Sequence, residues 1–269
     1  MNLASGRPSG NRRVAGSGPL VGSLYRYAEL MLDDADIERI LVICAHPDDV
    51  DFGAAGTVAT WTDRGINVTY CLVTDGDAGG FDPSIPRWEM GPLRRREQTA
   101  AAAEVGVKDL VFLGHPDGMV VASLDLRRDL SRVIRQVRPQ RVVIQSPERN
   151  LARIYASHPD HLATGEAALC AVYPDARNPF TFTELLTEEG LGAWTVPEVW
   201  IMGGPEADHP VDVTDQVERK LAALACHASQ HTDPTALFER VRGWMRLTAG
   251  QHSLGEGRAA EGFRVVDTR

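Results

Sequence analysis

Short runs of apolar residues alternate with longer segments of mixed polarity along most of the chain. The runs are rich in valine, isoleucine and leucine and are too short for helices, which is typical of strands buried in a sheet. We expect strands at Ile40–Cys44, Val68–Val73, Leu110–Leu113, Val142–Gln145 and Val196–Met202, and a short one at Val211–Val213. We expect helices between them, one before the first strand and one after the last, at Leu24–Leu32, 52–64, Leu93–Val105, Leu124–Val137, 158–172 and Val217–Ser229. This alternation predicts an α/β fold with a Rossmann-like, mainly parallel sheet flanked by helices.

The two ends of the chain lack this pattern. Residues 1–22 are rich in glycine, serine, arginine and proline, and we expect a disordered leader there. Arg12-Arg13 is similar to a twin-arginine export signal, but the residues after it are too few and too rich in glycine for an export core. Residues 240–269 show no clear periodicity. A chain of 269 residues can bury one large core, so we expect residues 23–269 to form a single domain.

Charge, hydropathy and cysteine content limit the expected binding partners and the expected location in the cell. The net charge is -9 and the pI is near 5.4, which argues against nucleic-acid binding and favours small neutral or cationic substrates. No apolar stretch reaches the ~20 residues that a membrane-spanning helix needs, so we expect no membrane anchor. The four cysteines are isolated and form no CxxC pair, which favours the cytoplasm. A homo-oligomer is compatible with the sequence, which does not fix the oligomeric state.

Two histidine motifs follow predicted strands. Residues 44–49 have the sequence Cys-Ala-His-Pro-Asp-Asp and come directly after the first strand, before a glycine-rich helix start. Residues 158–161 have the sequence His-Pro-Asp-His and open a later helix. Open α/β sheets bind ligands at the carboxyl ends of their strands, and we expect both motifs there. Together they predict a divalent-metal site.

The donor types suit a catalytic zinc site with three protein ligands and one open position. His46, Asp49 and His161 supply two imidazoles and a carboxylate. Asp48 is then the candidate general base, which takes a proton from the attacking water. His158 is the candidate group that stabilises an oxyanion or protonates a leaving amine. Iron, cobalt or nickel could occupy the same ligands.

Each motif alone has a structural explanation, since loop histidines make local hydrogen bonds and paired aspartates cap helices. Two such motifs at strand ends of one sheet are a coincidence that this explanation does not predict. A nucleotide-binding Rossmann protein is disfavoured because no GxGxxG sequence follows the first strand.

The chain resembles the LmbE-like or PIG-L-like family of zinc-dependent N-acetylglucosaminyl deacetylases. The resemblance rests on residues 45–49 with Gly53–Thr57, on 73–76, on 158–161 and on 220–230, which contain His-Ala-Ser-Gln at 227–230. It implies that His46, Asp49 and His161 are the metal ligands, that Asp48 is the base and that His158 is the second histidine. The residue types indicate the same roles. One departure is Val50, where the family usually has Glu.

The resemblance also implies substrate contacts. Arg96, with Glu97, and Asp117 resemble positions that hold the sugar, and Tyr155 lies near a tyrosine that helps the oxyanion in some members. A solvated helix face explains the arginines at 94–96 equally well, and a structural role for His227 is the simpler expectation.

The expected function is therefore removal of the N-acetyl group from an N-acetylglucosamine-containing small molecule or glycoconjugate. The alternatives are an amidase for a larger acyl group or a thiol-conjugate amide, and a sugar-binding module without catalysis. The aglycone stays open.

Overall fold

The computed structural model describes residues 31–269. The predicted leader at 1–22 and nearly all of the predicted helix at Leu24–Leu32 lie outside the described residues. A search of the described residues finds no helix that is both long and apolar enough to cross a membrane.

One seven-stranded sheet organises the unit that spans Leu32–Arg269, and its strand order is β3-β2-β1-β4-β5-β7-β6. The strands are β1 (Arg39–Cys44), β2 (Asn67–Thr74), β3 (Asp109–His115), β4 (Arg141–Gln145), β5 (Glu198–Met202), β6 (His209–Asp212) and β7 (Ala260–Asp267). The first five strands pair in parallel, and β7 pairs antiparallel with both β5 and β6. The predicted mainly parallel, Rossmann-like α/β fold is confirmed.

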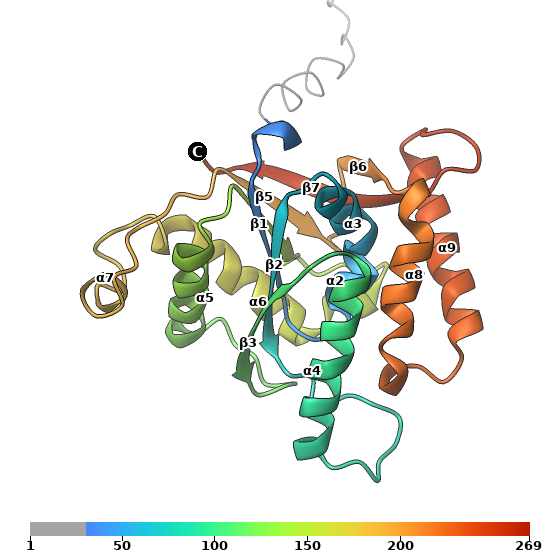
Figure 1. Cartoon of the computed structure of the whole chain (residues 1–269), viewed down its shortest axis with the longest axis horizontal. Coiled ribbons are helices and arrows are strands. Elements are labelled where there is room, and N and C mark those ends of the chain that lie inside the picture. The colour runs from blue at the N-terminus through green and yellow to red at the C-terminus, as the bar shows by residue number, and fades with distance from the viewer. Residues whose placement is uncertain (1–30) are drawn as a thin grey trace, which may run out of the picture. The chain divides into compact units, whose positions relative to one another are not determined.

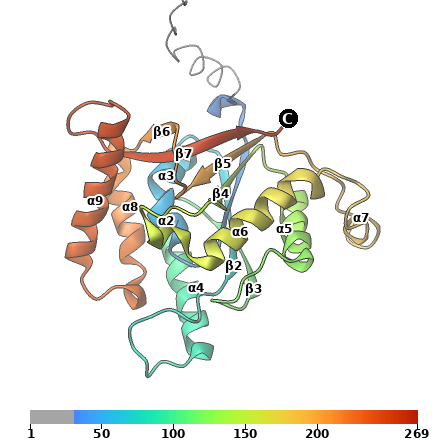
Figure 2. The ribbon, with the colours of Figure 1, turned by 180° about the vertical axis from the view of Figure 1, so that it is seen from behind.

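Helices cover both faces of the sheet (Figures 1 and 2). They are α2 (Asp49–Gly53), α3 (Ala55–Asp63), α4 (Arg87–Glu104), α5 (Leu124–Val137), α6 (Pro159–Cys170), α7 (Glu184–Thr187), α8 (Val217–Ala225) and α9 (Pro234–Gln251). Short turns of other helix types are η1 (Asp34–Asp36), η2 (Ile154–Ser157), η3 (Ala171–Asp175), η4 (Thr214–Gln216) and η5 (Ala228–Gln230). Helices α5 and α6 lie on one face, and α3, α4 and α8 on the other, with α9 beside α8.

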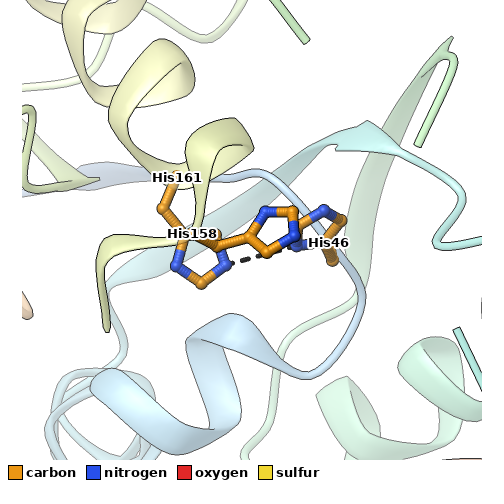
Figure 3. A group of neighbouring side chains, drawn as sticks. All are labelled: His46, His158 and His161. Carbon is orange, nitrogen blue, oxygen red and sulfur yellow. Dashed lines mark hydrogen bonds between the residues drawn. The ribbon is translucent and has the colours of Figure 1, made fainter. Parts of the chain in front are cut away.

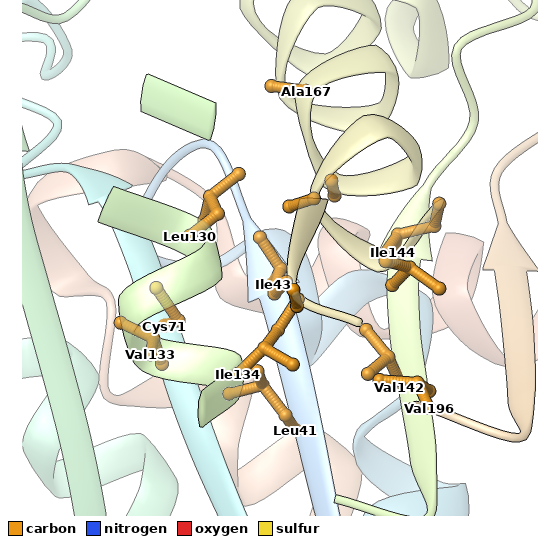
Figure 4. Packing of buried hydrophobic residues seen from close by; sticks show 14 of the residues in the cluster. Leu41, Ile43, Cys71, Leu130, Val133, Ile134, Val142, Ile144, Ala167 and Val196 are labelled. Atoms are coloured by element: carbon orange, nitrogen blue, oxygen red, sulfur yellow. The ribbon is translucent and has the colours of Figure 1, made fainter. Parts of the chain in front are cut away.

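The main core lies between the sheet and the pair α5 and α6 (Figure 4). Its strand residues include Leu41 and Ile43 of β1, and Leu130 and Ile134 face them from α5; all four are fully buried. Spacing of four along α5 places its apolar side chains on one stripe, as the sequence pattern predicts. This core fixes α6, which carries the second histidine motif, against β1 and β4.

Two elements near the carboxyl terminus were not predicted. Helix α9 buries Leu237, Val241, Met245 and Ala249 at a spacing of four, but exposed apolar residues such as Leu247 on its outer side obscure that stripe. Strand β7 mixes charged residues and a glycine into its sequence, and its Glu261 is buried because Lys220 pairs with it. The exposed apolar residues of α9 and the charged residues of β7 therefore hid both elements in the sequence pattern of residues 240–269.

The strand order reverses between β1 and β4, which lie side by side with Ile43 opposite Ile144. At such a switch point the connections leave toward opposite faces, which opens a crevice at the carboxyl ends of the two strands. Both histidine motifs follow these two strands.

Candidate metal centre

The loop after β1 is held at its base by the two neighbouring strands. The Ala45 N–H donates to Gln145 Oε1 at the end of β4, at 2.8 Å. The Ala45 carbonyl accepts from Thr74 Oγ1 at the end of β2, at 2.9 Å. The next residue, His46, therefore leaves the sheet in a fixed direction above its edge.

Helix α6 begins above the same edge. Its N-cap is His158, whose Nδ1 accepts from the Asp160 N–H at 3.2 Å, and Pro159 occupies the first turn. Close packing against β4 depends on Gly165, because a Cβ there would lie 2.3 Å from the Gln145 carbonyl oxygen. This approach brings the amino-terminal turn of α6, with His158 and His161, over the loop that carries His46 (Figure 3).

Three side chains with potential ligand atoms converge at this point. His46 Nδ1 lies 3.2 Å from His161 Nε2, and Asp49 Oδ1 lies 2.9 Å from His161 Nε2. The third distance, from His46 Nδ1 to Asp49 Oδ2, is 3.4 Å. Tetrahedral zinc with bonds of about 2.0 Å to nitrogen or oxygen separates its ligand atoms by about 3.3 Å. Each distance is near that value, and His46 and His161 approach different oxygens of Asp49, so the three side chains suit a zinc-sized cation.

Hydrogen bonds on the far side of each ring decide which nitrogen carries a proton. His161 Nδ1 lies 3.3 Å from the Ala156 carbonyl oxygen, which can only accept, so Nδ1 is the donor. His46 Nε2 lies 3.0 Å from Asp117 Oδ1 and 3.1 Å from Asp160 Oδ2, so Nε2 is the donor there. In the neutral rings, His46 Nδ1 and His161 Nε2 both present lone pairs toward the same point. Lone pairs that face each other repel unless a proton or a metal cation lies between them. Without a metal the proton is favoured: burial lowers the pKa of both rings, but the neighbouring carboxylates outweigh burial, raise the pKa of His46 to about 12 and also raise that of His161.

The carboxylate of Asp49 is suited to bind a cation together with His46 and His161. Burial raises the pKa of its carboxyl, but in the metal-free protein the charge and hydrogen bonds of protonated His161 and His46 outweigh burial and hold the pKa well below its ordinary value. The side chain is thus ionised, and Asp49 Oδ2 also accepts from the His46 N–H at 2.7 Å, which fixes its orientation. An ionised carboxylate and two imidazoles are a common donor set for zinc.

Asp117 and Asp160 form a supporting layer behind His46. Asp160 is 1% exposed, and its oxygens accept from the Gly118 and Val120 N–H groups at 2.7 and 3.2 Å. Burial raises the pKa of Asp117, but its hydrogen bonds from His46 and the Ala78 N–H lower the pKa to about 2. His46 belongs to two groups of potential metal ligands in the described residues, one with His158 and His161 and one with Asp117 and Asp160. Both carboxylates accept from His46 Nε2 and from backbone N–H groups, an arrangement that orients the His46 ring.

Asp48 lies beside the converging ligands in a strained conformation. Its φ is 87°, in the left-handed region that non-glycine residues rarely adopt. Gln98 Oε1 accepts from the Asp48 N–H at 2.8 Å, and Arg94 donates to Asp48 Oδ2 at 3.1 Å. Burial is the largest influence on its pKa and, against the opposing charge of Arg94, raises it from 3.8 to about 6. A carboxyl with this pKa changes protonation state near neutral pH, as a general base must.

The arginine that reaches the site is Arg94, not Arg96. Arg94 is 4% exposed and donates to the Pro47 and Gly76 carbonyls as well as to Asp48. Gly76 permits this contact, because a Cβ there would lie 2.2 Å from the Arg94 guanidinium. Arg96 is exposed, about 200° away from Arg94 around α4. Sequence periodicity alone did not reveal which of the three arginines faces inward.

The remaining predicted residues fall into two groups. His158 lies in the centre, with its ring 5.0 Å from that of His46 (Figure 3). Burial, followed by the neighbouring His46 and His161, lowers the pKa of His158, and its Nδ1 accepts from Asp160, so Nε2 carries the proton of a neutral ring. Tyr155 is 86% exposed on η2. The structure thus brings together His46, Asp48, Asp49, His158, His161 and Asp117, and leaves Arg96 and Tyr155 at the surface.

The chain is similar to a known protein family and to proteins described as deacetylases. Residues 41–172 match the family model PIG-L, described as GlcNAc-PI de-N-acetylase. A diacetylchitobiose deacetylase of Thermococcus kodakarensis is 33% identical over 233 residues, which cover 86% of this chain and 84% of that protein. A probable N-acetyl-alpha-D-glucosaminyl L-malate deacetylase 2 of Bacillus anthracis is 31% identical over 75% of this chain and 85% of its own length.

A solved structure gives the same result. N,N'-diacetylchitobiose deacetylase from Pyrococcus horikoshii, in complex with its inhibitor MPG, superposes with a TM-score of 0.82 and 28% identity. The superposition covers 94% of this chain and 95% of that one.

Proposed function

The chain belongs to the PIG-L family, and on that basis we propose that it is a metal-dependent hydrolase that removes the N-acetyl group from an N-acetylglucosamine-containing small molecule. Deacetylation of such molecules is the activity that the names of its relatives state. The observation that carries the proposal is the pair of ring nitrogens of His46 and His161 that face each other at 3.2 Å beside the buried carboxylate of Asp48.

His46, Asp49 and His161 are the residues that hold the metal in this proposal. Zinc is the preferred ion because two imidazoles and one carboxylate suit it and leave a position open, although Fe²⁺, Co²⁺ or Ni²⁺ tolerate the same donors. When bound, such an ion makes water more acidic and polarises the oxygen of the substrate amide.

Asp48 is the proposed general base. Its pKa near 6 leaves the carboxylate ionised at neutral pH, ready to accept a proton from the water that attacks the amide carbonyl. Arg94 and the backbone bond to Gln98 hold this carboxylate in place. The protonated Asp48 can then return the proton to the amine nitrogen as acetate leaves.

His158 is the proposed stabiliser of the charge that develops on the amide oxygen. A neutral ring with its proton on Nε2 is a hydrogen-bond donor, which suits this role at neutral pH. Its lowered pKa makes Asp48 the better source of the proton for the leaving amine.

The substrate is proposed to be an N-acetylated amino sugar, with the aglycone open. Contacts from Asp117, Arg96 and Tyr155 to the sugar stay predictions, and Asp117 has a second role in orienting His46. We also propose that residues 23–269 act as one domain in the cytoplasm and that copies of the chain can associate.

The test is acetate release from a panel of N-acetylglucosaminides, with metal content measured on the same sample. The proposal predicts release by the wild-type protein that a chelator abolishes. Asp48→Asn should retain the metal and lose turnover. Activity on larger acyl amides alone would point to the rival amidase, and sugar binding without acetate release would point to the non-catalytic module.

A further inference from the structure

A second buried pair of ionisable groups lies beneath Asp48. His227 Nε2 is 2.8 Å from Asp51 Oδ2, and the two side chains are 1% and 0% exposed. The residues are 176 positions apart in sequence, so the contact is made by the fold and not by a local turn. The proposed reaction uses neither group.

Gln98 links this pair to the general base. Its Nε2 donates to Asp51 Oδ2 at 2.9 Å, and its Oε1 accepts from the Asp48 N–H at 2.8 Å. Gln98 is itself fully buried. A continuous chain of hydrogen bonds therefore runs from His227 through Asp51 and Gln98 to the Asp48 backbone.

The series of hydrogen bonds ends at the backbone N–H of Asp48, the residue with the strained φ. A positive φ at a non-glycine residue costs on the order of 1–3 kcal/mol and persists only where its surroundings impose it. The bond from the Asp48 N–H to Gln98 is one such restraint. Asp51 accepts from the nitrogen of the Gln98 amide and thereby favours the orientation in which the amide oxygen faces the Asp48 N–H.

His227 in turn orients Asp51. Asp51 Oδ2 receives hydrogen bonds from both His227 and Gln98, whereas Asp51 Oδ1 and His227 Nδ1 have no partner within residues 31–269. The segment around His227 is attached to α4 independently, because Ser229 donates to Glu97 through both its N–H and its Oγ. The bond of His227 to Asp51 is thus separable from the bonds that hold this segment.

From these contacts we infer that His227, Asp51 and Gln98 are positioning residues that fix the orientation of the Asp48 carboxylate. The inference rests on the proposed function, in which Asp48 is the base. It assigns a role to the histidine of the His-Ala-Ser-Gln segment, 227–230, for which a structural role was the simpler expectation.

The first test compares two substitutions of His227. His227→Gln keeps a side-chain N–H that can donate to Asp51, whereas His227→Phe fills the space without a donor. We expect kcat of His227→Phe to fall about 10- to 100-fold with little change in KM and the same metal content, which is the usual cost of losing an orienting partner. His227→Gln should recover most of that loss. Because His231 lies in the same segment but has no bond to this chain of residues, His231→Phe is the matched control and should turn over at the wild-type rate.

A double-mutant cycle tests whether the residues act together. Gln98→Met removes both amide hydrogen bonds at similar side-chain length. If the hydrogen-bonded residues act as a unit, the double variant His227→Phe/Gln98→Met will have about the same kcat as the slower single variant. Multiplied losses would show that the two residues act separately and would overturn the inference.

A second measurement tests the inference without relying on catalytic activity. Amide hydrogen exchange at Asp48, followed by NMR, reports directly on its bond to Gln98. We expect exchange at this amide to be at least about tenfold faster in His227→Phe than in wild type, and close to wild type in His227→Gln. Unchanged exchange in His227→Phe would overturn the inference. Should the wild-type protein release no acetate, the proposed function would fail while the exchange measurement still decided this inference.

Discussion

His46 Nδ1 and His161 Nε2 face each other at 3.2 Å, and each ring donates a hydrogen bond from its other nitrogen. One ring follows β1 and the other lies in α6 after β4, on the two sides of the point where the strand order reverses. The fold thus aims two imidazole nitrogens and an ionised carboxylate at one point. A divalent cation suits these three groups, and the predictions below follow from this arrangement.

Metal binding should stabilise the folded protein, because the three ligand atoms converge only in the native fold. A metal at 100 times its dissociation constant adds about 2.7 kcal/mol to the free energy of unfolding. For a chain of this size that corresponds to a rise in Tm of about 5–10 °C. Thermal unfolding with zinc and with a chelator measures the difference. Asp49→Ala should lose this response, and a full response in that variant would contradict the ligand assignment.

Asp160→Asn should weaken metal binding although Asp160 is not a proposed ligand. The substitution removes the charge from one of the two carboxylate partners of His46 Nε2, and losing such a partner typically costs 10- to 100-fold in metal affinity. Competition with a chromophoric chelator gives the affinity. The exposed Asp63→Asn is the control and should bind like wild type. Equal affinities for all three proteins would show that Asp160 does not support the ligand.

The pH dependence of turnover should have an acid limb set by Asp48. The base works only when ionised, so kcat/KM should fall about tenfold for each pH unit below its pKa. Burial places that pKa at about 6, and a bound cation moves it lower because the cation favours the carboxylate. The limb should therefore lie at or below pH 6. A limb well above pH 7 would assign the base to another group.

Gly165→Ala should destabilise the protein and disturb the site together. The added methyl group would meet the Gln145 carbonyl at 2.3 Å, and relieving this overlap requires α6 to move away from β4. Such overpacking costs about 1–3 kcal/mol. Chemical denaturation measures the loss, and metal affinity should fall with it because His161 moves too.

Gly243→Ala is the matched control for that substitution. Gly243 lies within α9 with open space where its Cβ would be, so alanine should stabilise the helix by about 0.5–1 kcal/mol. Destabilisation of both variants to the same extent would argue against the close contact of α6 with β4.

The sequence predicted the fold and the centre of the site because both depend on short-range patterns. Runs of β-branched residues indicate buried strands, and the carboxyl ends of parallel strands lie at one edge of the sheet. Placing His46 and His161 at two such ends was enough to predict that they meet. Residue types then suggested the metal.

What the sequence did not predict depends on the packing of helices. The inward direction of Arg94 follows from how α4 docks beside the loop at Gly76, and periodicity does not fix that angle. The same is true of His227 and Asp51, which a long-range contact joins. Asp117 was expected near the site, but its bond to His46 depends on the turn after β3.

Acetate release measured against metal occupancy tests the account most directly. Samples of the chain loaded with increasing amounts of zinc, from fully chelated to one ion per chain, would be assayed with an N-acetylglucosaminide such as diacetylchitobiose. The account predicts that acetate and free amine appear in equal amounts and that the rate rises in proportion to the bound metal. Undiminished release by the fully chelated protein, or none from any N-acetylated amino sugar at one ion per chain, would contradict it.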